Sequence, residues 1–342
     1  MPDKTITILG IESSCDETSA AIVAEGKILA NIIAGQDVHR FYGGVVPELA
    51  SRAHQQNIVP VVSQSLKVSG ISKRNISAIA YTRGPGLMGA LLVGASFAKA
   101  MALALDVPLI EVNHMQAHIL AHFIKEKDGS GNAPDFPFLC LTVSGGHTQI
   151  IKVKSHLDME IIGETTDDAA GEAFDKIAKV MGFPYPGGPF VDEYAKQGNP
   201  LRFSFPHPNM PDFNYSFSGI KTSFMYFLRD ELAKDPDFLE NNKADICASI
   251  QKTIVDVLLA KLLKAARHEN INAVALAGGV SANTGLRDSI KKMGEKENWK
   301  VFIPKFEYCT DNAAMIAITG YYKYLNGDFS SQEKAPNARL HF

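Results

Sequence analysis

The sequence predicts an α/β protein built from two related lobes with a cleft between them. The chain has 342 residues, which is too many for one ordinary core. Several short runs alternate apolar and polar residues at the spacing of strands. The same order of elements also occurs twice: a β-meander whose first turn consists of small residues, then a strand, a glycine break and a helix. We therefore expect a duplicated architecture.

The first half contains a meander, two further strands and three helices. In chain order we expect strands at 5–11, 18–24 and 27–35, a helix from Pro47 towards Leu66, a strand at 77–82, an Ala-rich helix to about Leu105, a strand at 108–112 and a helix from near His114. Pro47 can begin a helix because its missing N–H has no partner there anyway. Gly84-Pro85-Gly86 ends the fourth strand.

The second half follows the same plan after a charged, Gly- and Pro-rich linker at 126–137. Its expected elements are strands at 138–143, 148–153, 159–165 and 272–277, and a helix from near Ser281 after the Gly278-Gly279 break. Several helices between 168 and 269 enlarge this half. We expect an N-terminal lobe over 1–130 and a C-terminal lobe over 137–311 with a helical insertion at 168–269. The last helix, at about 312–327, can pack back on the first lobe.

Composition narrows the class of protein. Hydrophobic residues make up 46% and charged residues 21% of the chain, as in globular proteins, and no secretion signal is visible. The apolar run from Leu87 to Leu105 is interpreted as a buried helix. Four cysteines without a CxxC pair favour a reducing cytosol over a disulfide framework or a thiolate zinc site. With a net charge of −3, binding of a nucleic acid would need a local basic patch or a partner.

Two histidines at helical spacing suggest a metal site. His114 and His118 are four residues apart, so they lie on one face of a helix for which Asn113 is a candidate N-cap. His122 continues the spacing, which leaves open whether the pair is 114/118 or 118/122. Asp311 opens the last helical pattern; its simplest role is to cap that helix, but it can also supply a carboxylate ligand. Two histidines and a carboxylate suit zinc or iron(II).

A zinc protease is the obvious alternative for two histidines at this spacing. Such proteases use H-E-x-x-H, in which the glutamate activates water. The second position here is Met115. The sequence therefore argues against a protease.

Other polar residues lie beside the glycine breaks. Glycine-rich turns at strand ends can place backbone N–H groups around an anion. Asp175, Gly188, Asp192 and Asn283 lie next to such turns or on the helices that follow them. Asp175 could instead form only an exposed helical ion pair, and Asn283 could simply cap a helix.

Taken together and in order, these motifs resemble the bacterial TsaD family from about residue 6 to 325. The segments that carry the resemblance are 10–18 (GIESSCDET), 114–118 (HMQAH), 143–148 (VSGGHT), 171–176 (GEAFDK), 185–189 (YPGGP), 217–222 (FSGIKT), 278–283 (GGVSAN) and 309–312 (CTDN). The first segment is similar to the bacterial and mitochondrial branch of the family.

The resemblance implies a fold, a reaction and a set of site residues. The fold would be actin-like or hexokinase-like, with duplicated ribonuclease H-like lobes around a central cleft. The reaction would transfer the threonylcarbamoyl group from threonylcarbamoyl-AMP to N6 of the adenosine next to the anticodon, in tRNAs that read codons beginning with adenine, and release AMP. The implied metal ligands, for iron or zinc, are His114, His118 and Asp311. The implied adenylate-binding residues are Thr142, Val143, Ser144, Gly145, Gly146, Asp175, Gly188, Asp192 and Asn283.

Three further expectations concern the details of this reaction. Thr142 stands where the archaeal branch has a tyrosine that can reach the metal, so the fourth metal ligand is left to water or a substrate oxygen. Asp16 or Glu17, in the first turn, is the candidate base for the attacking amine. The resemblance implies a TsaB-type paralogue and a TsaE-type ATPase as partners, with a homodimer as an alternative. Helices 47–66 and 87–105 are candidate docking surfaces for the paralogue, although core packing is the expected role of most of their residues.

Three other readings remain open from the sequence: a small-molecule kinase of the same fold, an ATP-dependent O-carbamoyltransferase and a non-enzymatic ATP-binding regulator. A kinase would need a catalytic aspartate near the second hairpin and would have no use for the histidine pair. The carbamoyltransferase would combine a metal with an adenylate but use a small acceptor.

Overall fold

The computed structural model describes residues 5–342 and divides the chain into two compact units. The first unit consists of residues up to Pro134, Ser155–Met159 and Pro304–Phe342; the second consists of Asp135–Lys154 and Glu160–Ile303. The last helix of the chain thus belongs to the first unit, although it follows the second in sequence.

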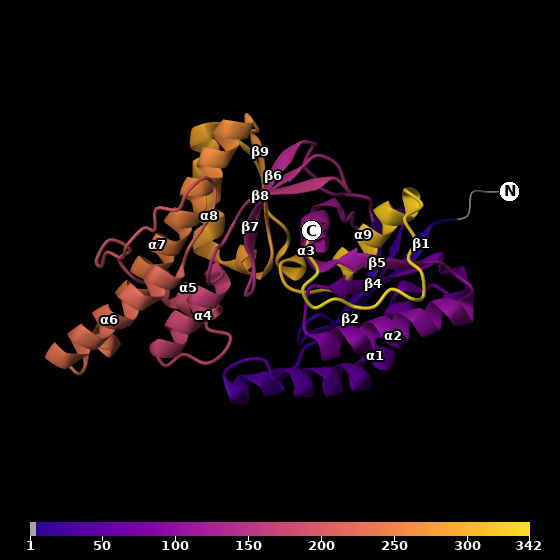
Figure 1. Cartoon of the computed structure of the whole chain (residues 1–342), viewed down its shortest axis with the longest axis horizontal. Coiled ribbons are helices and arrows are strands. Elements are labelled where there is room, and N and C mark those ends of the chain that lie inside the picture. Colours follow the sequence, from indigo (N-terminus) through magenta and orange to yellow (C-terminus); the bar gives the residue numbers. More distant parts are fainter. Residues whose placement is uncertain (1–4) are drawn as a thin grey trace. The chain divides into compact units, whose positions relative to one another are not determined.

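The first unit contains a five-stranded sheet in the order β3-β2-β1-β4-β5 (Figure 1). Its strands are β1 (Thr7–Glu12), β2 (Thr18–Ala24), β3 (Lys27–Ala34), β4 (Ala78–Gly84) and β5 (Leu109–Asn113). The first three form the predicted antiparallel meander, and β4 and β5 continue it in parallel to β1. The carboxyl ends of β1, β4 and β5 therefore meet at one edge of the sheet.

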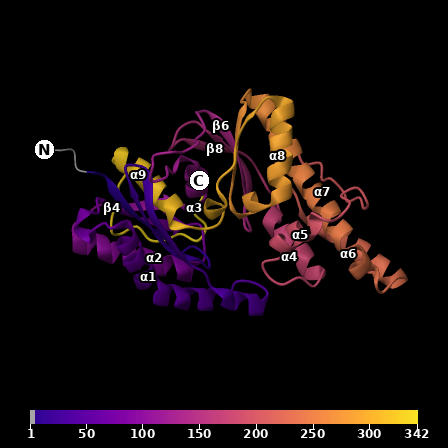
Figure 2. The same ribbon diagram turned by 180° about the vertical axis from the view of Figure 1, so that it is seen from behind.

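Helices cover both faces of this sheet. On one face α1 (Pro47–Ser69) and α2 (Met88–Leu105) lie side by side, and they pack against Leu9 and Ile11 of β1. Gly10, which points the other way because side chains alternate along a strand, faces α9 (Ala313–Leu325). The short helix α3 (His114–Leu120) follows β5 directly and packs against α9 (Figure 2). The 3-10 turns of this unit are η1 (Asp37–Tyr42), η2 (Lys73–Asn75), η3 (Ala121–Phe123) and η5 (Phe306–Tyr308).

Helix α2 differs from its expected role as a buried helix. It buries Leu91 and a row of small residues against β4 and α1, but Leu92 and Leu103 are 48% and 74% exposed. Among the described residues it is the one helix whose length and apolar composition would allow a membrane crossing. The expected buried helix is therefore buried on one side only, because its apolar residues surround the helix while only one side of it packs.

The segment Ser330–His341, here called the C-terminal strap, follows the edge strand β5. Ser330 forms an isolated antiparallel bridge with Leu109 at the start of β5. Further along, the strap receives a hydrogen bond from the Arg83 side chain, and the carbonyl of His341 accepts one from Asn113 Nδ2 at 3.1 Å. The strap therefore gives the edge strand a partner and reaches the residue where α3 begins.

The second unit repeats the strand order of the first. Its sheet has the order β10-β9-β6-β7-β8, which equals the first order when read from β8. The strands are β6 (Phe138–Val143), β7 (Thr148–Val153), β8 (Met159–Glu164), β9 (Ala273–Ala277) and β10 (Lys300–Phe302). β7 is antiparallel to β6, whereas β9 is parallel to β6 and β10 to β9. The predicted duplication is confirmed, and β10 is the strand that the sequence did not predict.

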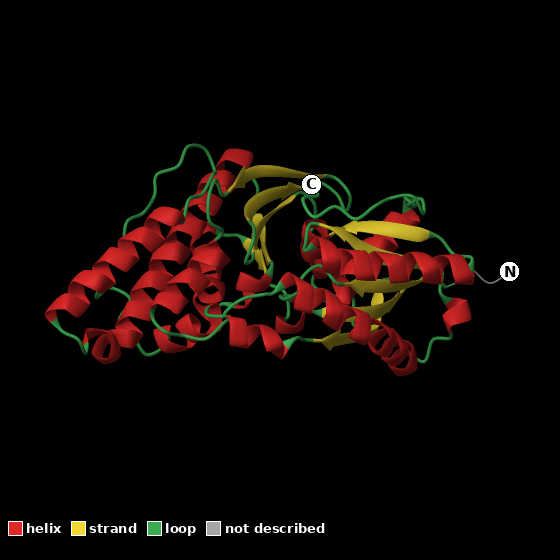
Figure 3. Ribbon diagram, turned by 60° about the horizontal axis from the view of Figure 1, so that its bottom comes forward, coloured by secondary structure: helices red, strands yellow, loops and turns green. Residues whose placement is uncertain are grey.

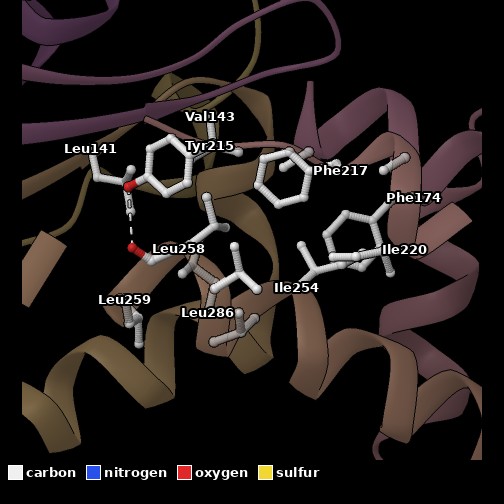
Figure 4. Packing of buried hydrophobic residues seen from close by; sticks show 14 of the residues in the cluster. Leu141, Val143, Phe174, Tyr215, Phe217, Ile220, Ile254, Leu258, Leu259 and Leu286 are labelled. Atoms are coloured by element: carbon white, nitrogen blue, oxygen red, sulfur yellow. Dashed lines mark hydrogen bonds between the residues drawn. The ribbon is translucent and has the colours of Figure 1, made fainter. Parts of the chain in front are cut away.

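Helices dominate the rest of the second unit (Figure 3). They are α4 (Ala170–Val180), α5 (Gly188–Ala195), α6 (Ser218–Lys234), α7 (Phe238–Glu269) and α8 (Thr284–Glu297), with the 3-10 turn η4 (Gly279–Ala282). The helix expected near Ser281 thus begins as η4 and becomes α-helical at Thr284. Figure 4 shows the core, in which Tyr215 is fully buried and donates its hydroxyl to the carbonyl of Leu258 at 3.2 Å.

Candidate metal centre and substrate-binding residues

Two imidazole side chains project from the same face of α3. Asn113 ends β5 and caps the helix, because its Oδ1 accepts hydrogen bonds from the backbone N–H groups of Met115 and Gln116 at 2.9 and 3.2 Å. The predicted cap is confirmed. The rings of His114 and His118 are buried, and their centroids lie 4.7 Å apart.

Asp311 lies opposite these two rings. Its Oδ1 is 3.3 Å from His114 Nε2 and 3.2 Å from His118 Nε2, and the three candidate ligand atoms lie within 4.8 Å of one another. Asp311 is not the cap of α9. Asn312 has that role, with its Oδ1 accepting from the backbone N–H of Met315 at 3.1 Å. The expected capping role was therefore wrong, and the carboxylate of Asp311 is free to face the histidines.

The pKa values of Asp311 and His114 are both shifted in this group. Burial alone would raise the pKa of Asp311, but His114 and His118 outweigh it and hold that pKa far below its usual range. Burial alone would lower the pKa of His114, but Asp311 and Glu12 outweigh it and raise that pKa well above its usual value. Two imidazole nitrogens and one carboxylate oxygen form a donor set that fits zinc or iron(II). His122 is buried in η3, and among the described residues the metal-competent group contains His114, His118 and Asp311 without it.

Glu12 is a residue of the candidate site that sequence reasoning did not identify. It is the last residue of β1 and fully buried. Its Oε2 lies 3.1 Å from His114 Nδ1, the ring nitrogen that faces away from Asp311. An acidic residue closing an otherwise apolar strand was the available signal, since a buried carboxylate needs partners.

The turn after β1 carries the two candidate bases. Asp16 and Glu17 are half-buried. Burial, together with the charges of Asp311 and Asp16, raises the pKa of Glu17 to about 9. His54 of α1 holds this turn: its Nε2 donates to the carbonyl of Cys15 at 2.9 Å. The turn therefore lies within the electrostatic reach of Asp311.

In the second unit, the β6–β7 turn presents backbone rather than side chains. Thr142 and Val143 are buried at the end of β6, and Ser144 closes the turn by accepting at Oγ from the backbone N–H of His147 at 3.1 Å. Gly145 and Gly146 are both exposed, with open space where a side chain would project. Their N–H groups are accessible to an anion.

Asp175 lies on α4, and its carboxylate holds the start of α5. Its Oδ1 accepts from the backbone N–H groups of Gly187 and Gly188 at 2.8 and 3.1 Å. The alternative role as an exposed ion pair is wrong, because the neighbouring Lys176 pairs with Asp168 and Glu172 instead. Burial raises the pKa of Asp175 in spite of these two hydrogen bonds.

Asp192 and Asn283 both serve the start of α8. The carboxylate of Asp192, on α5, accepts from the backbone N–H of Thr284 at 3.1 Å and from its hydroxyl at 2.8 Å. Asn283 caps the helix through Leu286, as expected, and its Nδ2 donates to Gln251 at 2.7 Å. Both side chains are thus fixed in place.

Gly278 brings this region to the end of β6. It has a φ of +83°, and a Cβ there would stand 2.5 Å from the carbonyl oxygen of Val143. η4 contacts both β6 and α4. The second unit therefore gathers the glycine turn after β6, the α4–α5 connection and the start of α8 into one region.

Comparison with known proteins identifies the family. The family model described as TsaD, tRNA N6-adenosine threonylcarbamoyltransferase, matches residues 27–318. The chain belongs to the TsaD family. Relatives of that name from Phocaeicola vulgatus and Porphyromonas gingivalis are each 62% identical to it, over 97% and 98% of this chain and 98% and 99% of theirs. The relative from Christiangramia forsetii is 59% identical over the full length of both chains.

Solved structures establish the fold. HypF from T. kodakarensis matches 98% of this chain and 49% of its own with a TM-score of 0.60 at 15% identity. Full-length HypF in the phosphate- and nucleotide-bound form matches 95% of this chain and 47% of its own, also at 0.60, with 14% identity. The expected actin-like class of the TsaD family is confirmed.

Proposed function

We propose that this chain transfers the threonylcarbamoyl group of threonylcarbamoyl-AMP to N6 of the adenosine next to the anticodon, in tRNAs that read codons beginning with adenine. The convergence of His114, His118 and Asp311 carries the proposal, in a chain 62% identical to two relatives named for this reaction. In the reaction, N6 forms a bond to the carbamoyl carbon, the bond from that carbon to the phosphate oxygen breaks, and AMP leaves.

The metal ligands proposed are Nε2 of His114, Nε2 of His118 and Oδ1 of Asp311. The ion would be iron(II) or zinc, since both accept two imidazoles and a carboxylate. When bound, such an ion supplies a Lewis acid for a carbonyl oxygen. The protein's contribution is a fixed, largely buried set of three ligands, with the Asp311 side chain 22% exposed and so accessible from solvent.

The adenylate is proposed to bind the second unit. Backbone N–H groups of Gly145 and Gly146 would hold its phosphate, because they are exposed and carry no side chain. The remaining proposed contacts are Thr142, Val143, Ser144, Asp175, Gly188, Asp192 and Asn283. The hydrogen bonds that fix Asp175 and Asp192 support this proposal, since a preorganised site loses little entropy when it binds.

A base is needed to take the proton that N6 loses, and Asp16 and Glu17 are the proposed candidates. The pKa of Glu17, raised to about 9 by burial and by the charges of Asp311 and Asp16, keeps its proton on near pH 7. A positive charge beside Asp311 would lower that pKa and allow Glu17 to accept a proton. The test is transfer by Asp16→Asn and Glu17→Gln; unchanged rates in both, with substrate binding intact, would remove the base from this turn.

The proposed partners are tRNA, a TsaB-type paralogue and a TsaE-type ATPase in the cytoplasm. The exposed apolar side chains of α1 and α2 support a docking surface for the paralogue, since Val59, Leu92 and Leu103 project from adjacent helices. A second copy of this chain is the alternative occupant. The net charge of −3 supports the need for a partner in tRNA binding.

The decisive experiment incubates the chain with its partners, an adenylate-forming enzyme, threonine, bicarbonate, ATP and unmodified tRNA, and analyses the nucleosides by mass. We expect threonylcarbamoyladenosine to form in the tRNA, and to form only when the metal ion is present. Product formed without tRNA from a small acceptor would indicate the O-carbamoyltransferase, and phosphorylation of a small molecule would indicate the kinase. His207→Ala, which removes an exposed histidine of the second unit, is the control variant for substitutions of the proposed metal-binding histidines.

A further inference from the structure

Glu12 has hydrogen-bond donors on both carboxylate oxygens. Oε1 accepts from the backbone N–H of Ser14 at 2.5 Å, and Oε2 accepts from the hydroxyl of Thr82 at 2.6 Å. The remaining contact of Oε2 is His114 Nδ1, at 3.1 Å. The side chain is fully buried, so these neighbours take the place of water.

The charge of Glu12 decides which atom carries the proton between Glu12 and His114. Both oxygens of Glu12 accept hydrogen bonds from other fixed donors, Oε1 from the backbone N–H of Ser14 and Oε2 from the hydroxyl of Thr82, which is the environment of a carboxylate. An ionised carboxylate can only accept hydrogen bonds, so Nδ1 of His114 must donate. The Ser14 hydroxyl, 3.3 Å from the same nitrogen, then acts as a second acceptor. In the neutral ring, a proton on Nδ1 leaves the lone pair of Nε2 free.

We propose that Glu12 is the positioning residue of the metal centre: it holds His114 as the Nδ1–H tautomer with Nε2 directed at the cation site beside Asp311. This inference rests on the proposed metal site. It adds a residue outside the ligand set, and it assigns a function to the end of β1. Carboxylates in this position orient metal-binding histidines and increase their basicity.

The Nδ1 atoms of the two histidines differ in their hydrogen bonds, so Glu12 can fix the tautomer of only one of them. Nδ1 of His118 is buried and has no hydrogen-bond partner among the described residues. Its ring is oriented by packing and by Asp311 alone, at 3.2 Å. Glu12 is thus the carboxylate that fixes a tautomer in this pair.

Glu12→Gln tests the tautomer while keeping the shape of the side chain. The fixed N–H of Ser14 requires the amide oxygen of the glutamine, so the NH₂ group would face His114 Nδ1. Nδ1 would then become the acceptor, and the ring proton would move to Nε2, where it blocks the metal. The hydroxyl of Thr82 can rotate to accept, so the substitution needs no change in packing.

The experiment measures the affinity of the whole chain for Zn(II) and Co(II) by competition with a chromophoric chelator. We expect about 10- to 100-fold weaker binding in Glu12→Gln, with an altered Co(II) absorption spectrum. The matched control is Glu111→Gln, which also removes a carboxylate from the first unit but one that pairs with Arg83. It should bind both ions as the wild type does.

A second measurement uses the wild type and does not depend on the variant folding. In ¹⁵N-histidine-labelled, Zn(II)-loaded protein, the His114 resonances are assigned by their loss in His114→Gln. A protonated, hydrogen-bonded Nδ1 supports the inference, and an unprotonated Nδ1 overturns it. Folded Glu12→Gln that binds Zn(II) as tightly as the wild type would also overturn it and leave the metal site intact. Failure of the wild type itself to bind either ion would instead refute the proposed metal site.

Discussion

Gly10 of β1 lies directly under Ala313, the first residue of α9. A Cβ at Gly10 would stand 2.5 Å from the carbonyl oxygen of Ala313, closer than such atoms approach. This close contact allows α9 to pack tightly against the sheet. Because Asp311 lies two residues before α9, we expect this contact to influence the distance from Asp311 to the histidines of α3.

Gly10→Ala should therefore weaken the metal centre and the first unit together. Displacing α9 costs about 1–3 kcal/mol of the free energy of unfolding, as overpacked cores do. We expect a lower urea midpoint and weaker Zn(II) binding. Gly35→Ala is the control, because a Cβ at Gly35 meets no atom within 4 Å; it should change the stability by less than about 1 kcal/mol. If Gly10→Ala is destabilised but binds Zn(II) as tightly as the wild type, the prediction that the position of α9 affects the metal site is wrong.

Removal of one metal ligand should abolish both metal binding and transfer. His118→Ala and Asp311→Ala each delete one of three donors, and Asp311→Ala also removes the negative charge that attracts the cation. Chelator-treated wild type should regain activity when the ion is restored, whereas the variants should not. Metal content by elemental analysis, read beside the transfer assay, checks this. Full activity in a metal-free variant would show that transfer does not need the ion.

Asp175 should show opposite effects on stability and on activity. Its folded-state pKa is raised, so the folded protein holds this proton more tightly than the unfolded chain. Its contribution to stability is therefore fully present below the unfolded pKa and is lost as the pH rises through the folded pKa. Asp175→Asn should then unfold at an equal or higher urea concentration near pH 7, an advantage that disappears below the unfolded pKa of about 3.9. Transfer activity should fall.

Asp168→Asn is the control with the opposite sign. Burial would raise the pKa of Asp168, but Lys176 and Lys221 outweigh it and lower that pKa. This carboxylate stabilises the fold above its unfolded pKa, and its contribution is lost as the pH falls through the folded value. The variant should therefore be less stable than the wild type near pH 7. If both variants changed the stability near pH 7 in the same direction, the opposite pKa shifts of Asp175 and Asp168 would be contradicted.

The exposed side of α2 should be needed for complex formation and not for folding. Leu103 is 74% exposed, so Leu103→Glu should leave the melting temperature unchanged and weaken binding of the TsaB-type paralogue roughly 10-fold or more. Leu201→Glu is the matched control, since Leu201 is 77% exposed in the second unit. Size-exclusion chromatography of the mixture measures the effect. Dissociation of a homodimer by Leu103→Glu would identify a second copy as the occupant.

Local patterns in the sequence predicted most of the elements. Strands β2, β6 and β7 have the expected bounds, and the Asn113 cap was visible because capping depends on residues two or three positions away. β10 was missed because three residues carry too little alternation. The exposed side of α2 was not predicted, because composition alone does not show which side of a helix packs against the protein.

Site residues that depend on distant partners could not be found in this way. Glu12 acquires its role from His114, 102 residues further along the chain. The capping role expected for Asp311 is filled by its neighbour Asn312, which the sequence alone did not distinguish because Asp and Asn are both favoured cap residues. The histidine pair was readable because helix geometry places residues four apart on one face.

The first unit is discontinuous in sequence, and this affects when a new chain can assemble the proposed metal site. His118 and Asp311 are separated by 193 residues, and the whole second unit is synthesised between them. At about 5–20 residues per second, the ribosome needs on the order of 10–40 s to cover that interval. During this time the face of β1 that α9 later covers lacks its helix, so nascent chains of this protein should depend on chaperones until translation is nearly finished.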